Sequence, residues 1–184
     1  LNTRNTLERD LDMTMGFWNC SKPTISAVHG HCLAGGCELA LACDITIASA
    51  DSRFGEPELR FGAGIVCMIL PWLTGPKQAK ELIFTGNDKI TAERALAMGL
   101  INHVVAEGEA LTSAVEMAGQ IAVMDEHAMV LSKKAINRAY EIMGMQPDGH
   151  TLVEQAELLL VTMGFAPPKA APPAPQPQPP QPQP

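Results

Sequence analysis

The sequence predicts an α/β fold that ends in a helical region. Two apolar segments rich in β-branched residues, 24–28 and 44–48, have the length and composition of buried strands. Between them a glycine-rich turn leads into residues 37–43, which are mostly apolar and typical of a buried helix. After a last strand-like segment at 100–105, helical patterns alone follow. Strands that alternate with helices, and then helices only, indicate an α/β core with a helical end.

The first half of the chain contains a further helix and several short segments. Residues 1–20 carry an apolar stripe at four-residue spacing, which predicts a helix that ends before a Lys-Pro pair. We expect residues 53–55 to form a short edge piece and residues 56–64 to form a loop. Residues 65–73 are strongly apolar, and the helix expected there should kink or break near Pro71.

The second half shows clear signals for helix starts and ends. Pro76 suits the first turn of a helix that ends at Gly86. Thr91 is a good N-cap for a short helix that closes at Gly99. Further helices are expected at about 110–124, 126–143 and 151–163.

Charge and hydropathy exclude several classes of protein. The formal net charge is −7 and the Lys133–Lys134 pair is the only basic cluster, so we expect no nucleic-acid partner. No apolar run reaches the ~18–20 residues that span a membrane, so we expect no membrane partner. The N-terminal residues 1–10 are polar and charged, unlike a secretory signal.

The cysteines and histidines do not form a metal-binding pattern. The sequence has five cysteines, an odd number, without a C-x-x-C motif. They are expected to be reduced core residues of a cytoplasmic protein. His29 and His31 flank a glycine, but no cysteine or histidine follows at a spacing that suits metal ligands. We therefore expect no metal site.

Gly35 and Gly36 stand where a strand turns into a helix. The N–H groups at a helix start have no partner within the helix, and the helix dipole is positive there. Glycine lets a ligand approach these groups closely. The turn can therefore bind an anion, or an oxygen that becomes anionic during a reaction. Close packing of the helix explains the glycine pair equally well when this segment is taken alone.

Two glutamates are candidates for acid–base chemistry. Glu38 lies about one turn into the predicted helix, among apolar residues, where an unpartnered carboxylate would be costly. Its position therefore indicates a function. Glu58 follows a proline that restricts the backbone of the loop. A solvated loop acid is an equally good interpretation of Glu58 by itself.

Six short motifs follow one another at a characteristic spacing. They are residues 22–30 (KPTISAVHG), 33–40 (LAGGCELA), 43–44 (CD), 54–58 (FGEPE), 82–86 (LIFTG) and 95–102 (ALAMGLIN). In order and distance they resemble the crotonase, or enoyl-CoA hydratase/isomerase, family, and the resemblance covers roughly residues 7–140. It implies the ClpP/crotonase fold, an α/β fold with a ββα-type core and a helical C-terminal trimerisation region.

For the function, the resemblance implies an enzyme that adds water to a trans-2-enoyl-CoA. The thioester oxygen would lie at Ala34, Gly35 and Gly36, with the N–H of Gly35 as one of two oxyanion donors. Glu38 and Glu58 match the two glutamates of hydratases. Glu38 would hold the attacking water, and Glu58 would give a proton to C2. Coenzyme A would enter as part of the acyl-CoA substrate, and no separate cofactor is implied.

The resemblance also suggests how the chain is divided. Residues 1–105 would be the C-terminal part of the crotonase core, and residues 106–165 a helical oligomerisation region. Residues 166–184, which hold most of the 15 prolines, are expected to be a disordered Pro/Gln-rich tail. Family members form trimers or dimers of trimers, so we expect a homotrimer or hexamer. The family's other oxyanion donor would lie upstream of Leu1, so an N-terminal truncation is expected.

Two alternatives to hydration stay open. An isomerase or an acyl-CoA hydrolase of the same family would use the same oxyanion hole, although the isomerases tend to lack a glutamate at the position of Glu38. Residues 64–73 are also bulkier than the glycine-containing run that many hydratases have after the second glutamate. The other alternative is an inactive fragment that only associates with partner subunits.

Overall fold

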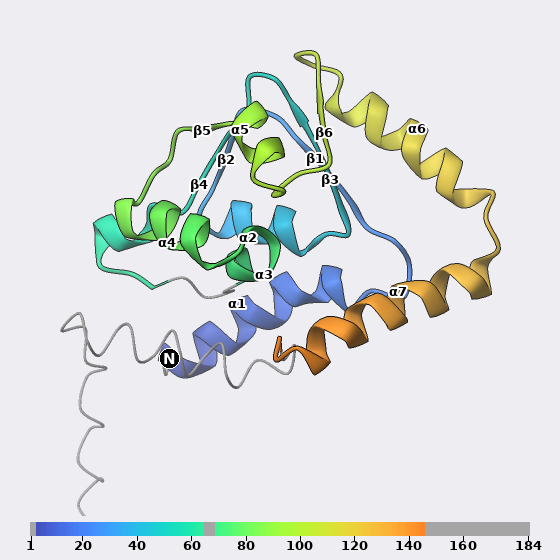
Figure 1. The fold of residues 1–184 in the computed structure, drawn as a ribbon, viewed down its shortest axis with the longest axis horizontal. Helices are drawn as coiled ribbons and strands as arrows, with labels where there is room; N and C mark the ends of the chain where they lie inside the picture. Colours follow the sequence, from blue (N-terminus) through green and yellow to red (C-terminus); the bar gives the residue numbers. More distant parts are fainter. Residues whose placement is uncertain (1–2, 65–68, 146–184) are drawn as a thin grey trace, which may run out of the picture.

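The computed structural model describes residues 3–64 and 69–145 of the 184-residue chain (Figure 1). In these ranges, the short strands lie in the upper part of the view in Figure 1, with helices beside and below them. The elements in chain order are α1 (Thr3–Trp18), β1 (Ile25–Val28), β2 (His31–Leu33), α2 (Gly35–Ala42), β3 (Ile45–Ser49), β4 (Arg53–Gly55), the 3₁₀ helix η1 (Glu58–Phe61), α3 (Leu70–Thr74), α4 (Pro76–Thr85), β5 (Ile90–Thr91), α5 (Ala92–Ala97), β6 (His103–Val105), α6 (Ala110–Ala122) and α7 (Glu126–Ile142).

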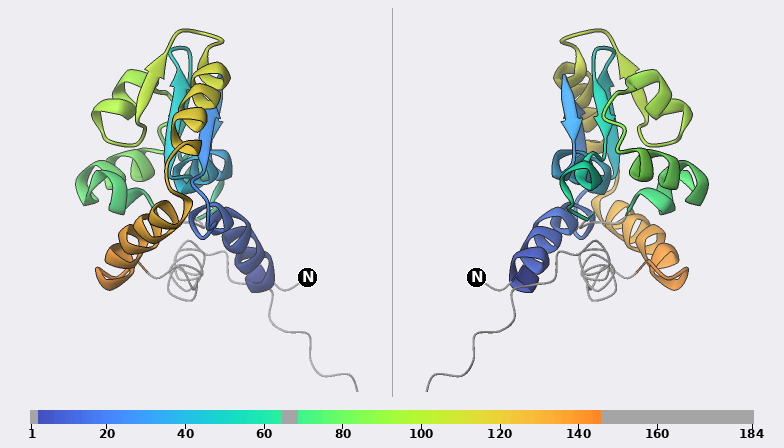
Figure 2. Two further views of the ribbon diagram at one scale, coloured as in Figure 1. Left: turned by 90° about the vertical axis from the view of Figure 1, so that its right-hand side faces the viewer. Right: turned by 90° about the vertical axis from the view of Figure 1, so that its left-hand side faces the viewer.

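The first sheet is parallel and has the strand order β1-β3-β6. Ile25 of β1 lies opposite Ile45 of β3, and Ile47 lies opposite His103 of β6. The apolar segments at 24–28 and 44–48 thus form neighbouring strands, as predicted. Helix α6 packs against all three strands, and Figure 2 shows it lying along one face of this sheet. The strand expected at 100–105 is shorter than predicted, because only its last three residues pair with β3.

The second sheet consists of very short strands and has the order β2-β4-β5. β2 and β4 are parallel, whereas β4 and β5 are antiparallel. The prediction of an edge piece at 53–55 is therefore wrong, because β4 is the central strand of this sheet. Phe54 is fully buried, and a Cβ atom added to Gly55 would lie 2.1 Å from the carbonyl oxygen of Asn87. Only glycine fits so close to that backbone.

The helix boundaries follow the capping residues. The hydroxyl of Thr91 accepts a hydrogen bond from the backbone N–H of Arg94, which confirms this N-cap. Gly86 has the left-handed conformation that ends α4. Pro71 lies in the first turn of α3, where its missing N–H costs no helical hydrogen bond, and residues 65–68 of the helix in which a kink or break was predicted lie outside the described residues. The helix predicted at 151–163 and the tail at 166–184 lie outside the described residues.

Helix α7 is attached to the rest of the molecule by polar and aromatic contacts. The Lys133 side chain is 8% exposed, and its ammonium group lies 2.7 Å from a carboxylate oxygen of Asp44. The same oxygen accepts hydrogen bonds from the backbone N–H and the hydroxyl of Thr24. The rings of Trp18 and Tyr140 pack edge to face, with centroids 5.8 Å apart. These contacts join α7 to α1 and to the ends of the first sheet.

Candidate active site

The site is positioned by the parallel pairing of β2 with β4. Leu33 at the end of β2 lies opposite Gly55 at the end of β4. The backbone N–H of Ala34 extends the pairing by donating to the carbonyl oxygen of Gly55 at 2.9 Å. Because neighbouring parallel strands end at the same edge of a sheet, the segments that follow them meet. One is the turn into α2, and the other contains Glu56 and Glu58.

The turn into α2 leaves backbone N–H groups at an open helix end. Ala34 has φ 56° and ψ −136°, a backbone conformation that is energetically unfavourable for residues other than glycine. Residues in such conformations cluster at functional sites. Its carbonyl oxygen accepts the N–H groups of Cys37 and Glu38. The helix begins with Gly35 and Gly36, which are exposed, and a Cβ atom added to either would meet no heavy atom within 4 Å. A ligand oxygen can therefore approach these two residues closely.

Glu38 is the acid of the α2 start. It lies in the first turn of the helix and is 5% exposed, between the fully buried Cys37 and the apolar remainder of α2. A carboxylate in the first turn of a helix is favoured by the helix dipole.

Glu56 is a third acid of this region, and it is not among the site residues predicted from the sequence. It follows Gly55 directly and is fully buried. Burial, together with the negative charges of Glu58 and Glu38, raises the pKa of its carboxyl group to about 10, whereas the thiol of Cys37 opposes the rise. Glu38 and Glu58 therefore both lie within electrostatic reach of Glu56.

Glu58 begins η1 directly after Pro57 and is half-buried. One of its carboxylate oxygens is buried, and no hydrogen-bond donor in residues 3–64 and 69–145 reaches it. Burial raises the pKa of Glu58, while its own backbone N–H and the side chain of Glu56 act in the opposite direction. The surroundings of Glu58 therefore influence how readily its carboxyl group holds a proton, as is common for acids in active sites.

The structure thus places the predicted site residues on two adjoining segments. Ala34, Gly35, Gly36 and Glu38 lie on the turn into α2, and Glu58 lies on the segment that follows β4. Both glutamates act on Glu56, whose position in the short sequence Glu-Pro-Glu after an apolar strand was the available signal. Within the described ranges, no three His, Cys, Asp or Glu side chains are grouped to hold a metal ion.

Comparison with known proteins places this arrangement in a family. The family model described as enoyl-CoA hydratase/isomerase matches residues 3–152. The chain belongs to the enoyl-CoA hydratase/isomerase family. It is 46% identical over 132 residues to the short-chain-enoyl-CoA hydratase of Clostridium acetobutylicum and 43% identical over 132 residues to the crotonyl-CoA hydratase of Syntrophomonas wolfei. Each match covers 69% of this chain and 48% of the relative.

Solved structures of the enoyl-CoA hydratase/isomerase family share the fold. The crystal structure of an enoyl-CoA hydratase/isomerase from Xanthobacter autotrophicus Py2 matches with a TM-score of 0.82 and 47% sequence identity. The match covers 89% of this chain and 60% of that structure. The predicted crotonase-like α/β fold is therefore confirmed. The chain spans about half the length of the curated relatives that it matches.

One further property of the chain concerns membranes. Among the helices of residues 3–64 and 69–145, none has both the length and the apolar character that a bilayer crossing requires.

Proposed function

We propose that this enzyme of the enoyl-CoA hydratase/isomerase family adds water to the double bond of a trans-2-enoyl-CoA. The observation that carries the proposal is the pairing of Leu33 with Gly55, which brings the open start of α2 next to the segment that holds Glu58. An oxyanion donor and two acids are the groups that hydration of an unsaturated thioester needs. The names of two relatives, a short-chain-enoyl-CoA hydratase and a crotonyl-CoA hydratase, support a short acyl chain.

The backbone at Gly35 is the proposed binding site of the thioester oxygen. As water attacks C3, the electrons of the double bond move toward this oxygen, which becomes enolate-like. The N–H of Gly35 and the positive end of the α2 dipole stabilise that charge. Ala34 orients the turn, and Gly36 keeps the approach open. In other enzymes, loss of one such donor costs roughly 2.7–4 kcal/mol of transition-state stabilisation.

Glu38 and Glu58 are the proposed proton acceptor and donor. Ionised Glu38 takes one proton from the water whose oxygen forms the new bond to C3. Protonated Glu58 then gives its proton to C2 of the enolate, which restores the thioester carbonyl. Glu38 ends the reaction protonated and Glu58 ionised, and a proton transferred back from Glu38 resets the pair. Burial favours this use of Glu58, because it raises the pKa of that carboxyl group.

Coenzyme A takes part in this reaction only as the carrier of the acyl group. The activated carbon atoms belong to the acyl chain, and the thioester supplies the carbonyl that the backbone polarises. The proposed chemistry therefore needs no separate cofactor.

We propose that the enzyme acts in the cytoplasm.

The complete protein should be assayed with three substrates. Crotonyl-CoA reports hydration, a 3-enoyl-CoA reports movement of the double bond, and a saturated acyl-CoA reports thioester hydrolysis. The proposal expects hydration of crotonyl-CoA to be the fastest of the three. A dominant 3-enoyl-CoA isomerisation or thioester hydrolysis would replace hydration by one of the related reactions. Absence of all three activities in a folded protein would favour a role confined to association with partner subunits.

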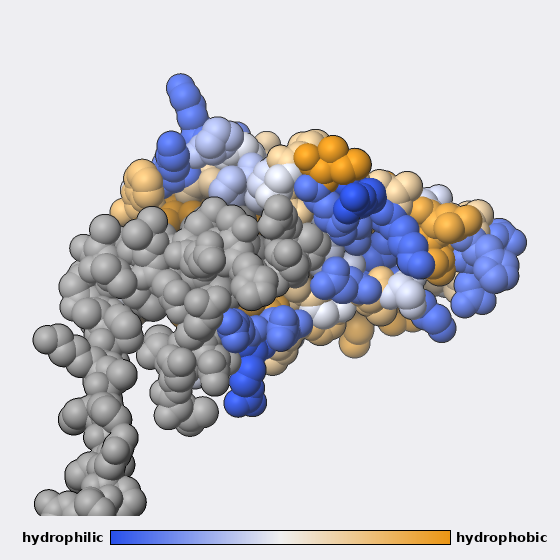
Figure 3. Space-filling model, turned by 90° about the horizontal axis from the view of Figure 1, so that it is seen from below, coloured by the Kyte–Doolittle hydropathy of each residue, from blue (hydrophilic) through white to orange (hydrophobic). Residues whose placement is uncertain are grey.

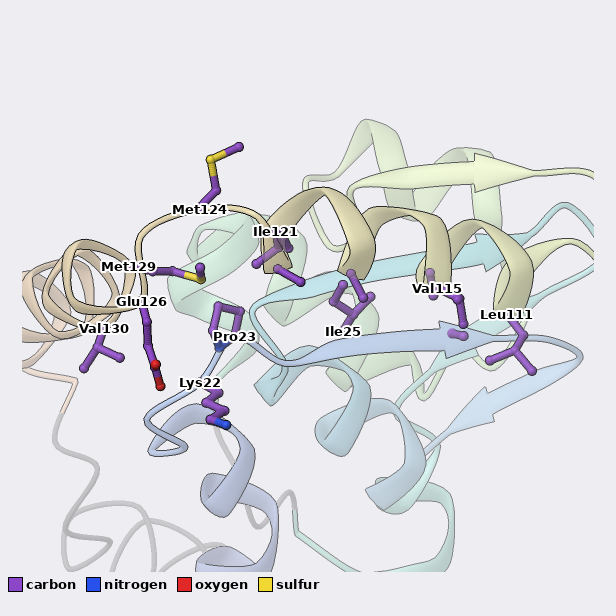
Figure 4. Close-up of a pocket in the computed structure, with 14 residues that line it drawn as sticks. Lys22, Pro23, Ile25, Leu111, Val115, Ile121, Met124, Glu126, Met129 and Val130 are labelled. Atoms are coloured by element: carbon purple, nitrogen blue, oxygen red, sulfur yellow. The ribbon is translucent and has the colours of Figure 1, made fainter.

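The proposed assembly is a homotrimer or a hexamer formed through the C-terminal helices. Leu111 and Val115 of α6 are 68% and 62% exposed, and Val123 beyond its end is 80% exposed. An apolar groove of about 580 Å³ lies between α6 and β1, and Figure 4 shows Ile25, Val115 and Leu111 along it. Figure 3 also shows apolar surface near the end of the molecule where α6 meets α7. Exposed apolar surface of this kind is typical of subunit contacts.

The mass of the complete protein in solution tests this assembly. Sedimentation equilibrium at several concentrations should give three or six times the subunit mass. Leu111→Lys, which places a charge on the exposed face of α6, should reduce the mass, whereas Glu116→Gln on the same helix should not. A monomeric wild-type protein would contradict the proposed assembly.

A further inference from the structure

Glu56 is a buried acid for which the described part of the molecule provides no counter-charge. Its side chain is fully buried, and no hydrogen-bond donor in residues 3–64 and 69–145 reaches either carboxylate oxygen with regular geometry. Ion pairs join Arg60 to Asp88, Lys133 to Asp44 and Arg138 to Glu141, and none of these three includes Glu56. An ionised carboxylate in such surroundings would be very costly.

The backbone holds Glu56 in this position. The preceding residue, Gly55, packs against the backbone of Asn87 and Asp88 so tightly that an added Cβ atom would overlap both. Its carbonyl oxygen also accepts the N–H of Ala34. The following residue, Pro57, is buried and restricts the chain on the other side. Glu56 therefore cannot move to solvent without disturbing both the second sheet and the turn into α2.

The titratable neighbours of Glu56 come from two elements, and two of the three are glutamates. Cys37 and Glu38 lie on α2, Glu58 begins η1, and Cys32 of β2 interacts with Cys37. The side chains of Glu56 and Glu58 affect each other's pKa, and both have buried carboxylate oxygens that no donor in the described residues reaches. Two ionised carboxylates cannot hydrogen-bond to each other, since each offers only acceptors, whereas a proton on one of them would supply the missing donor. Glu56, the more deeply buried of the two, is the one that burial favours as the uncharged acid.

We propose that Glu56 is a positioning residue that stays uncharged and donates a hydrogen bond to Glu58, thereby setting how readily Glu58 releases its proton. The role of Glu56 in catalysis rests on the proposed function, whereas the hydrogen bond to Glu58 does not. Burial alone would make Glu58 a weak acid, and the donor of Glu56 stabilises the carboxylate that remains when Glu58 has given its proton to C2. The effect of Glu56 on the reaction is therefore exerted through Glu58.

Two substitutions separate an uncharged Glu56 from an ionised one. Glu56→Gln has nearly the same shape as a protonated glutamic acid and keeps a donor, whereas Glu56→Met has a similar volume and no donor. If Glu56 is uncharged, Glu56→Gln leaves the titration of Glu58 unchanged. If Glu56 is ionised, the same substitution removes a negative charge next to Glu58 and lowers its midpoint. Glu56→Met should raise the midpoint of Glu58 by about one pH unit, because it removes a hydrogen bond to a charged group.

The titration of Glu58 can be measured without any enzymatic assay. The complete protein is labelled with ¹³C at the glutamate carboxyl carbons, and the Glu58 signal is assigned by its loss in Glu58→Gln. We expect the same Glu58 midpoint in the wild-type protein and in Glu56→Gln, and a higher one in Glu56→Met. A lower midpoint in Glu56→Gln, or an unchanged one in Glu56→Met, would overturn the proposal. If Glu56→Met does not fold, the result for Glu56→Gln still decides between the two charge states.

The pH profile of hydration adds the link to catalysis. The rate should fall above the pH at which Glu58 loses its proton. This fall should occur at a higher pH in Glu56→Met but at an unchanged pH in Glu56→Gln. A merely structural role of Glu56 would change the rate without changing the pH of this fall. If no hydration is detected while the ¹³C titrations behave as expected, the proposed function fails and the Glu56–Glu58 hydrogen bond stands.

Discussion

Leu33 of β2 lies directly opposite Gly55 of β4 in parallel register, and the next residue, Ala34, donates its N–H to the carbonyl oxygen of Gly55 at 2.9 Å. This pairing joins segments that are about twenty residues apart in the sequence. It places the open start of α2 beside the segment that contains Glu56 and Glu58. The candidate active site therefore depends on a sheet of very short strands.

Gly55→Ala should destabilise the protein strongly. The new Cβ atom would lie 2.1 Å from the carbonyl oxygen of Asn87 and 2.5 Å from the Cα atom of Asp88, and neither is part of a flexible side chain. Overpacking of this kind costs about 1–3 kcal/mol or more. Urea unfolding of the complete protein measures the loss. Gly16→Ala in α1 is the matched control, since its Cβ atom meets no heavy atom within 4 Å and should stabilise the helix by about 0.5–1 kcal/mol. Equal stability of the two variants would show that the Gly55 contact is not required.

Lys133→Met should loosen the attachment of α7. The buried ammonium group of Lys133 lies 2.7 Å from Asp44, and its removal leaves that carboxylate with only the hydrogen bonds from Thr24. Breaking a buried ion pair from one side costs about 3 kcal/mol. Thermal unfolding of Lys133→Met and of Lys134→Met, whose side chain is exposed, provides the comparison. We expect a clearly lower melting temperature for Lys133→Met and a nearly unchanged one for Lys134→Met. Equal melting temperatures would contradict the role given to Lys133.

Glu56 should make the stability of the protein fall as the pH rises. Its pKa is about 10 in the folded protein and 4.5 in the unfolded chain, so between these values only the folded state keeps the proton. The unfolded state then binds fewer protons, and the free energy of unfolding falls with pH, by at most about 1.4 kcal/mol per pH unit for one group. Urea unfolding at pH 5 to 9 measures this dependence. The free energy of unfolding of Glu56→Gln should increasingly exceed that of the wild-type protein as the pH rises. Parallel stability curves would contradict a neutral Glu56.

Much of the fold could be predicted because its signals are local. The apolar, β-branched segments around Ile25 and Ile47 indicate strands by composition alone, and Thr91 is recognisable as an N-cap from its position before a helical segment. The family motifs then suggest roles for Glu38 and Glu58, which stay predictions. These features need only a few consecutive residues, or a spacing along the chain, to be recognised.

The second sheet and the third acid could not be predicted in the same way. Strands of two or three residues, such as Ile90–Thr91, are too short to show a period. Glu56 resembles an ordinary loop acid in the sequence, because its burial results from the long-range pairing of Leu33 with Gly55 and from the contact of Gly55 with Asn87. The sequence Glu-Pro-Glu after an apolar strand is a local signal, but by itself it does not distinguish a buried acid from an exposed one.

The most direct test of the central claim is the turnover of crotonyl-CoA by the complete protein with Glu38→Gln and with Glu58→Gln. Each substitution should reduce turnover by about 10²–10⁴-fold, the usual contribution of a general acid or base, while circular dichroism shows an intact fold. Glu116→Gln, at an exposed position of α6, should keep wild-type turnover. Turnover near the wild-type value in both Glu38→Gln and Glu58→Gln would contradict the assignment of Glu38 and Glu58 as the two acids of the active site.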